Sequence, residues 1–146
     1  MNLLENPITN KEEVNNLIPQ KAPFVMVDKL LYFSENKIVS GFTISDANIF
    51  TFQSTFTTSG LVENMAQTVA LFTGYQYFLK QEPAPTGYIG AIKKVEIFNL
   101  PKKGDELVTT ATILFEMAGV TLVKIEIKCN EKIIALSEMK TVLAVL

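Results

Sequence analysis

The sequence predicts an α+β fold in which a largely antiparallel sheet curls around one long central helix. Residues 60–81 contain no proline and are rich in helix formers, and apolar residues occur on nearly every side of this stretch. A helix that is apolar all round is buried on most of its sides. Two strand-like segments precede the helix and four follow it, and only a sheet that bends around the helix can cover so much of it.

The predicted elements belong to a single domain over residues 1–146, without an internal repeat. Residues 1–14 are expected to be a loose lead-in that includes the start of a short helix over 11–17, with Thr9 or Asn10 as its N-cap. Ser59 is the expected N-cap of the long helix. The predicted strands cover residues 24–33, 37–45, 88–98, 106–116, 120–129 and 133–145.

In two of the strands after the helix, apolar and polar residues alternate, which predicts that one face of each strand lies on the core. In 106–116 the residues expected to share one face are Leu107, Thr109, Ala111, Ile113 and Phe115. In 120–129 the residues expected to point inward are Val123, Ile125, Ile127 and Cys129. Cys129 is therefore predicted to be a buried core residue rather than a nucleophile.

The composition excludes several classes of site. The chain has 146 residues, a formal net charge of −2, one cysteine and no histidine, and all 13 of its basic residues are lysine. The charge and the lack of arginine argue against a nucleic-acid partner. Without histidine the chain has neither an ordinary catalytic triad nor a histidine-based metal site. We therefore expect no metal and no cofactor.

The sequence also carries expectations about location. The first residues lack a basic region followed by a long apolar run, and a single cysteine suits a reducing compartment. Residues 61–79 approach membrane-spanning length, but polar side chains interrupt them too often for a lipid environment. We expect a cytoplasmic protein that has no membrane partner.

The long helix carries two features that point to a function. Ala66, Ala70 and Gly74 recur every fourth residue, so they lie on one face, where another backbone can approach closely. Glu63 is the only acidic residue of the helix and lies near its start. A carboxylate among apolar residues is costly unless it is hydrogen-bonded or functional. We expect Glu63 to be functional; the alternative is a structural group that caps the helix or pairs across an interface.

A single curled sheet leaves part of such a helix uncovered. Pairing two subunits edge to edge would cover the remainder and would also satisfy the free sheet edge. The sequence therefore predicts a dimer.

Four motifs, taken in order, resemble a known family. They are IPQKAPFVMVDKLL (18–31), VENMAQ (62–67), YIGAIKKVEIF (88–98) and LPKKGDEL (100–107). Their order is similar to that in the β-hydroxyacyl-acyl carrier protein dehydratases, which have the hot-dog fold, and in the relatives of aryl polyene and flexirubin pigment clusters. The resemblance extends from about residue 15 to the end of the chain.

The resemblance implies a dimer with one continuous sheet and two active sites at the interface. In that family a histidine of one subunit takes the α-proton of a β-hydroxyacyl thioester, and a carboxylate on the other subunit's central helix helps the hydroxyl leave. Glu63 matches this carboxylate, Gly60 matches the helix-start glycine whose amide holds the thioester carbonyl, and Gln67 matches a glutamine of the motif. The alternatives are a tight helix entry for Gly60 and a structural hydrogen bond for Gln67.

The catalytic histidine of the family is missing from this chain. It belongs to a loop before the helix, and the corresponding segment here is NIFTFQSTFTTSG (48–60). In the pigment-type relatives a histidine can also occur late on the helix, where this chain has Phe72. Threonine, serine and glutamine cannot take a carbon-bound proton at neutral pH, so the ordinary mechanism cannot run on this chain alone.

Two further groups of residues are candidates for binding. Phe50, Phe52 and Phe56 are candidates to line an acyl tunnel, with core packing as the alternative. Lysine side chains are candidates to dock an acidic acyl carrier protein, with a solvated surface as the alternative. They are Lys93, Lys94, Lys102 and Lys103.

Four functional hypotheses remain. The leading one is a catalytically degenerate protein that binds thioesters of acyl carrier protein or CoA. In a heterodimer it would give Glu63 and a tunnel wall to a histidine-bearing sister dehydratase. The other possible assembly is a homodimer. The second is a hot-dog acyl thioesterase that uses Glu63 with Gln67, Ser59 and Thr58. The third is a structural subunit without a ligand. The fourth is a dehydratase in which Glu63, with its pKa raised by burial, is both acid and base.

Overall fold

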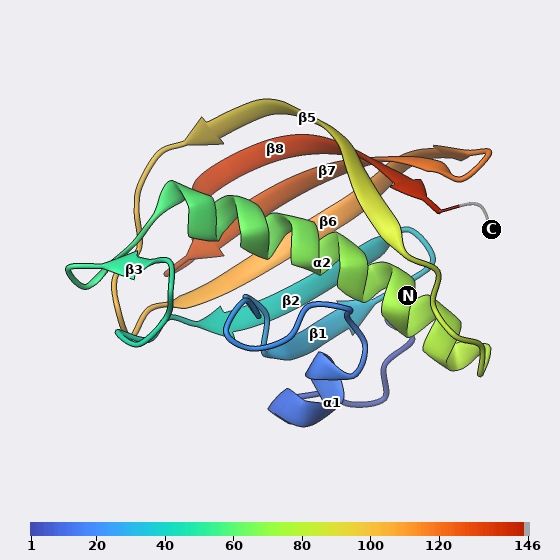
Figure 1. Cartoon of the computed structure of the whole chain (residues 1–146), viewed down its shortest axis with the longest axis horizontal. Helices are drawn as coiled ribbons and strands as arrows, with labels where there is room; N and C mark the ends of the chain where they lie inside the picture. Colours follow the sequence, from blue (N-terminus) through green and yellow to red (C-terminus); the bar gives the residue numbers. More distant parts are fainter. Residues whose placement is uncertain (145–146) are drawn as a thin grey trace.

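A six-stranded antiparallel sheet wraps around one long helix in the computed structural model, which describes residues 1–144 (Figure 1). The helix is α2, Thr58–Leu79. The strand order is β1–β2–β6–β7–β8–β5. These strands are β1 (Lys29–Phe33), β2 (Lys37–Thr43), β5 (Gly87–Ile97), β6 (Glu106–Met117), β7 (Val120–Cys129) and β8 (Lys132–Leu143). The predicted α+β fold is confirmed. The last predicted strand reached Val145, which lies outside the described residues.

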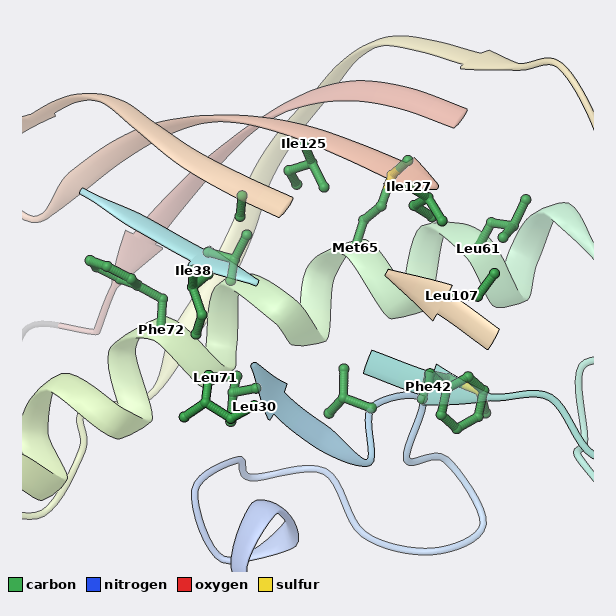
Figure 2. Close-up of a cluster of buried hydrophobic side chains, with 14 of the residues drawn as sticks. Leu30, Ile38, Phe42, Leu61, Met65, Leu71, Phe72, Leu107, Ile125 and Ile127 are labelled. Carbon is green, nitrogen blue, oxygen red and sulfur yellow. The ribbon is translucent and has the colours of Figure 1, made fainter. Parts of the chain in front are cut away.

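The hydrophobic core lies between α2 and the concave face of the sheet. Figure 2 shows Met65 pointing from α2 toward Ile125 and Ile127 of β7. All three side chains are fully buried. The buried residues of α2 are Gly60, Leu61, Asn64, Met65, Gln67, Thr68, Val69, Leu71, Phe72, Gly74 and Tyr75. One stripe of the helix is only half-buried, and it consists of Val62, Glu63, Ala66, Ala70, Thr73, Gln76 and Tyr77.

The helix α2 begins two residues earlier than the sequence predicts. Its N-cap is Thr57, whose Oγ1 accepts a hydrogen bond from the Gly60 amide at 3.4 Å. Ser59, the expected cap, lies inside the first turn, so that prediction is wrong. The cap is chosen by tertiary contacts: the Thr57 amide donates to the Phe50 carbonyl, which holds Thr57 in the extended conformation that a cap requires.

The segment before α2 contains a small hairpin in a region where no strand is predicted from the sequence. It consists of β3 (Thr51–Phe52) and β4 (Thr55–Phe56). Gln53 and Ser54 between them both have positive φ, 49° and 65°. This is the backbone conformation of a type I′ turn, which matches the twist of two antiparallel strands.

The first predicted strand, over 24–33, is only half correct, because β1 begins at Lys29. The preceding residues are held by side chains of α2 instead of by a neighbouring strand. The Met26 amide donates to Gln67 Oε1 at 2.6 Å, and the Met26 carbonyl accepts from Asn64 Nδ2 at 2.7 Å. Side chains of α2 therefore provide the hydrogen bonds that a neighbouring strand would provide if residues 24–28 formed the strand predicted from periodicity.

Residues 1–10 are packed against β1, which corrects the expectation of a loose lead-in. Ile8 and Leu30 exchange two backbone hydrogen bonds of 2.9 Å, and the Leu3 amide donates to the Phe33 carbonyl at 2.7 Å. The short helix α1 (Lys11–Asn15) follows, and Asn10 caps it as predicted. The N-terminal segment therefore covers the β1 edge of the sheet.

The predicted inward face of β7 is confirmed, since Val123, Ile125, Ile127 and Cys129 are all buried. On β6 the prediction is wrong at Phe115, which is 53% exposed. The register between β6 and β7 shifts between Ile113 and Phe115, as at a β-bulge. Such an extra residue breaks the period of two, so the alternation that holds up to Ile113 cannot be extended past it.

Candidate functional site

The half-buried stripe of α2 carries the candidate site, and the close backbone approach predicted for the small residues occurs at Gly74, which is buried beside this stripe. A Cβ atom built on Gly74 would collide with the backbone carbonyl of Leu17. The chain after α1 therefore passes directly against α2 at this glycine. Ala66 and Ala70, on the same stripe, line a pocket instead of a backbone contact.

Glu63 lies on this stripe, half-buried, one turn after the start of α2. Its Oε1 accepts a hydrogen bond of 2.9 Å from Gln67 Nε2, the partner expected from the spacing of four residues. The bond is formed with the neutral amide of Gln67, and residues 1–144 provide Glu63 with no ion pair. Glu63 is thus held at one oxygen while its side of the helix stays partly open.

Gln67 makes three hydrogen bonds and is fully buried. Besides its bond to Glu63, its Nε2 donates to the Phe24 carbonyl at 2.8 Å, and its Oε1 accepts from the Met26 amide at 2.6 Å. Most contacts of Gln67 are therefore structural hydrogen bonds to the backbone, which is the alternative given above for this residue. The same amide group positions both the Glu63 carboxylate and the chain at Phe24–Met26.

Sequence reasoning missed a buried polar network on the opposite side of α2. Asn64 accepts a hydrogen bond of 2.6 Å from Thr109 of β6 through its Oδ1. Thr68 lies 2.7 Å from Ser40 of β2, hydroxyl to hydroxyl, and donates to the Asn64 carbonyl. All four side chains are buried. The available signal was the pair of polar residues Asn64 and Thr68 at a spacing of four in an otherwise apolar helix.

Gly60 is buried at the first turn of α2, and its packing explains why no side chain is present. A Cβ atom there would lie 2.5 Å from Cζ of Phe56. Its amide already donates to the Thr57 cap. Glycine at this position therefore accommodates the Phe56 ring, and a bond from its amide to a substrate carbonyl stays a prediction.

The three phenylalanines proposed for an acyl tunnel are not gathered on one wall within the single chain. Phe56 is fully buried and packs against Phe42 with ring centroids 5.9 Å apart. Phe52 is 68% exposed at the tip of the small hairpin, and Phe50 is half-buried against the core. Their contact with an acyl chain remains a prediction.

A pocket of about 100 Å³ opens beside the stripe of α2. Its walls come from α2, from the chain that follows α1 and from the start of β5 and the end of β8. Among its lining residues are Leu17, Gln20, Ala66, Ala70, Tyr88 and Leu143. Glu63 precedes Ala66 by three residues, so the carboxylate and the pocket share one side of the helix.

The candidate docking lysines fall into two pairs. Lys93 and Lys94 belong to β5, whereas Lys102 and Lys103 belong to the loop before β6. Lys94 lies 3.9 Å from Glu138 and Lys103 lies 3.4 Å from Asp46. Exposed ion pairs of this kind are weak, so the four charges remain accessible to an acidic partner.

Two further observations concern metal sites and membrane-spanning helices. Within residues 1–144 no group of three or more metal-ligating side chains comes together. No helix in the same range is long and apolar enough to cross a membrane.

A central helix wrapped by an antiparallel sheet is the hot-dog fold, and solved structures of this class are similar to the chain. One is the dehydratase heterocomplex ApeI:P from Xenorhabdus doucetiae, with a TM-score of 0.84, 19% identity, and coverage of 90% of this chain and 91% of that chain. Another is a hypothetical thioesterase protein with coenzyme A from Streptococcus pneumoniae TIGR4, with a TM-score of 0.64, 9% identity, and coverage of 79% and 84%.

Sequence comparison identifies the family within this fold. The ApeP-like family model, described as ApeP dehydratase, matches residues 12–144. The chain belongs to the ApeP-like dehydratase family. It is also 29% identical over 139 residues to the 3-hydroxyacyl-[acyl-carrier-protein] dehydratase FabZ of Ruminiclostridium cellulolyticum. The aligned region covers 91% of this chain and 95% of that protein. The predicted resemblance to the hot-dog dehydratases is confirmed.

Proposed function

We propose that this protein is the histidine-less subunit of a heterodimeric dehydratase that acts on 3-hydroxyacyl thioesters of acyl carrier protein or CoA. The observation that carries the proposal is Glu63: its carboxylate is held by Gln67 on the partly open stripe of α2, in a chain without any histidine. Ala66, the first helix residue that lines the pocket, follows Glu63 by three residues. The acid of the reaction is present, and the base has to come from another subunit.

The proposed division of labour follows the chemistry of water elimination. A histidine of the sister subunit removes the proton from the carbon next to the thioester carbonyl. The electrons of that C–H bond form the new double bond as the C–O bond of the 3-hydroxyl breaks. Glu63 in its protonated form gives a proton to the departing oxygen, so that water leaves. The bond from Gln67 keeps the carboxyl group aimed at one place during this step.

The exposed edge of the sheet supports a partner subunit. Within residues 1–144, β5 pairs only with β8, so its other side presents backbone groups that no other strand of that range binds. The edge is rich in exposed apolar side chains, a combination that natural monomers usually avoid. These side chains are Tyr88, Ile89, Ile92 and Val95, with Phe98 just beyond the strand. The similarity to the ApeI:P heterocomplex favours a sister dehydratase over a second copy as the partner.

The test is an assay of the chain alone, of a histidine-bearing dehydratase-like protein from the same genome alone, and of the two after co-expression. We expect co-purification at a one-to-one ratio and dehydration of a 3-hydroxyacyl thioester only, or far faster, with the complex. Glu63→Gln in the complex should lower kcat by at least 100-fold because general acid catalysis contributes about 10²–10⁴-fold.

Glu35→Gln is the matched control, because Glu35 is exposed in the turn between β1 and β2. It should leave both the assembly and the rate unchanged. Full activity of the complex with Glu63→Gln would contradict the proposed role of Glu63 and leave a structural subunit. Activity of the chain alone would instead favour Glu63 as both acid and base.

A thioesterase is the second candidate, and the Glu63–Gln67 hydrogen bond is the observation that favours it. An ionised carboxylate that is oriented by an amide can activate water for attack on a thioester carbonyl. Ser59 lies four residues before Glu63, so both are on one side of α2. Release of free thiol from a panel of acyl-CoA esters, lost in Glu63→Ala, would support it; no release across the panel would remove it.

A further inference from the structure

The pocket beside α2 contains an unusual polar atom. Gln20 is one of its lining residues, and the Oε1 atom of Gln20 is buried without a hydrogen-bond partner in the described chain. A buried acceptor without a partner costs about 1–3 kcal/mol relative to a satisfied one. Folded proteins rarely keep such an atom unless a ligand or an ordered water provides the missing donor.

The surroundings of Gln20 make the pocket a shaped and mainly apolar slot. Ala66, Val69 and Ala70 of α2 form one wall, and Ile89 and Leu143 belong to the opposite one. The volume of about 100 Å³ is somewhat less than the roughly 150 Å³ of an apolar cavity that accepts benzene. The slot can therefore take a few carbon atoms together with one polar group.

The close contact between Leu17 and α2 forms part of the pocket wall. Gly74 and Leu17 both line it, and a Cβ atom on Gly74 would collide with the Leu17 carbonyl. A chain that enters from the side of Glu63 would meet the Leu17 backbone at Gly74. Glu63 and Thr73, which also lines the pocket, are ten residues apart on α2, or about 15 Å along its axis.

We propose that this pocket binds the far end of the acyl chain and that Gln20 accepts a hydrogen bond from a hydroxyl group carried there. The substrate class is then a medium-length 3-hydroxyacyl thioester with a second hydroxyl at its far end. This inference rests on the proposed function only in placing the thioester beside Glu63. Gln20 acts as a specificity-determining residue, since an unsubstituted alkyl end leaves its Oε1 unsatisfied.

The test uses ligands that cannot react, so that it does not depend on catalysis. Decanoyl and 10-hydroxydecanoyl pantetheine analogues, with an amide nitrogen in place of the thioester sulfur, are titrated by calorimetry into the protein in the assembly that it forms. We expect the hydroxylated ligand to bind about tenfold more tightly, as one well-made hydrogen bond in a buried site allows. Gln20→Leu should remove or reverse this preference.

Gln76→Leu is the matched control, because Gln76 is half-buried on α2 and does not line the pocket. It should keep the preference of the unaltered protein. A second variant, Ala70→Leu, fills the slot and should weaken both ligands, which tests the location if Gln20→Leu fails to fold. Equal affinities in the unaltered protein, a preference that survives Gln20→Leu, or no binding of either ligand would overturn the inference.

These outcomes are separate from those of the proposed function. A complex that dehydrates plain and hydroxylated substrates equally well would keep the dehydratase function and refute the role of Gln20. A protein that binds the hydroxylated analogue tightly without any dehydration, alone or with a sister subunit, would keep the pocket and refute the function. Preference for an analogue that ends in a carbonyl group would refute the role of Gln20 as an acceptor, because Gln20 would then donate the hydrogen bond.

Discussion

At the scale of single residues, Gln67 links the candidate acid to the rest of the molecule. Its side-chain amide serves Glu63, the Phe24 carbonyl and the Met26 amide at once. The resemblance to the dehydratases pointed to this position, but the residue type could not reveal which backbone groups it would bind. Those groups come from a segment about 40 residues earlier in the chain, which only folding brings to α2.

Gln67→Met tests this link, because methionine has a similar length but cannot replace the amide. The buried Met26 amide and the part-buried Phe24 carbonyl lose their partners, so we expect the free energy of unfolding to fall by about 1–4 kcal/mol, measured by urea denaturation. Gln76→Met on the same helix is the control and should change it by less than about 0.5 kcal/mol. A small effect of Gln67→Met would show that water satisfies the Phe24–Met26 segment.

Cys129 gives a pH prediction at the same scale. Burial raises the pKa of the Cys129 thiol above its ordinary value of 9.0, and the nearby Asp105 carboxylate raises it further. The folded protein therefore keeps the neutral thiol while the unfolded chain ionises. Stability from this group is complete below pH 9 and is lost as the pH rises through the folded value.

We expect the free energy of unfolding to decline above pH 9 and Cys129→Ala to make that decline shallower. Cys129→Ala should not abolish the decline, because burial also raises the pKa of Tyr75. The stability that the neutral Tyr75 hydroxyl contributes is therefore also lost in the alkaline range. Urea titrations between pH 7 and 11 measure both slopes. Identical slopes for the two proteins would contradict the assignment to Cys129.

At the scale of elements, close backbone contacts set how α2 lies against its neighbours. Gly74 is in direct contact with the Leu17 carbonyl, and Gly60 leaves room for the Phe56 ring. The spacing of the small residues in the sequence indicated a close approach on one face of the helix. It did not indicate that the partner at Gly74 would be Leu17, in the chain just after α1, rather than another strand.

Gly74→Ala should destabilise the protein by about 1–3 kcal/mol or more, because the Leu17 backbone has to move to make room. The control is Gly87→Ala at the start of β5, where a Cβ atom would lie 3.7 Å from Leu143, an ordinary contact. The control should be nearly neutral in thermal and urea denaturation. Equal effects of the two substitutions would show that the α2–Leu17 contact is not tight in solution.

The N-terminal segment is an element in its own right, since it covers the edge of β1. Deletion of residues 2–9 exposes that edge and removes the buried Leu4 side chain. We expect a lower urea midpoint and concentration-dependent aggregation, followed by light scattering. Leu3→Ser, at an exposed position, keeps the backbone bonds and should behave like the unaltered protein.

At the scale of the whole molecule, the two edges of the sheet are treated differently. In the described part of the chain, the β1 edge is covered by the N-terminal segment, whereas the β5 edge is open and rich in apolar side chains. A sheet with one open edge can join one partner and then has no further edge to offer. The arrangement therefore favours a closed dimer over a growing assembly.

Ile92→Lys on β5 should weaken that dimer, because it places a charge on the open apolar edge. Analytical ultracentrifugation of the complex with the sister subunit should show a shift toward separate subunits at concentrations at which the unaltered complex is fully assembled, with a circular dichroism spectrum of the chain that does not change. Ile49→Lys is the control, since Ile49 is 46% exposed, close to the 44% of Ile92, and lies before β3. Dissociation by both variants, or by neither, would count against the β5 interface.

The sequence by itself determined the family and most of the architecture. The apolar stretch at 60–81 and the alternation in 120–129 depend on local periodicity, which survives in any context, and the motif order indicated the dehydratase family now confirmed. The missing histidine was equally plain. Predictions from local periodicity fail where a bulge interrupts the strand, as at Phe115. The predicted N-cap of α2 is wrong because a hydrogen bond to the Phe50 carbonyl places Thr57 at the cap position.

Only the tertiary structure decided what the buried polar groups do. Phe56 and Phe52 have the same side chain and lie four residues apart, yet one fills the core and the other is solvent-exposed. Glu63, Gln67 and the Phe24–Met26 segment form one hydrogen-bonded unit, and Gln20 lines the pocket with Ala66 and Ala70, its Oε1 without a hydrogen-bond partner among residues 1–144. Hydrogen-bond partners distant in sequence are chosen by the packing of the whole chain, because a buried polar atom takes whatever donor or acceptor the fold places within reach.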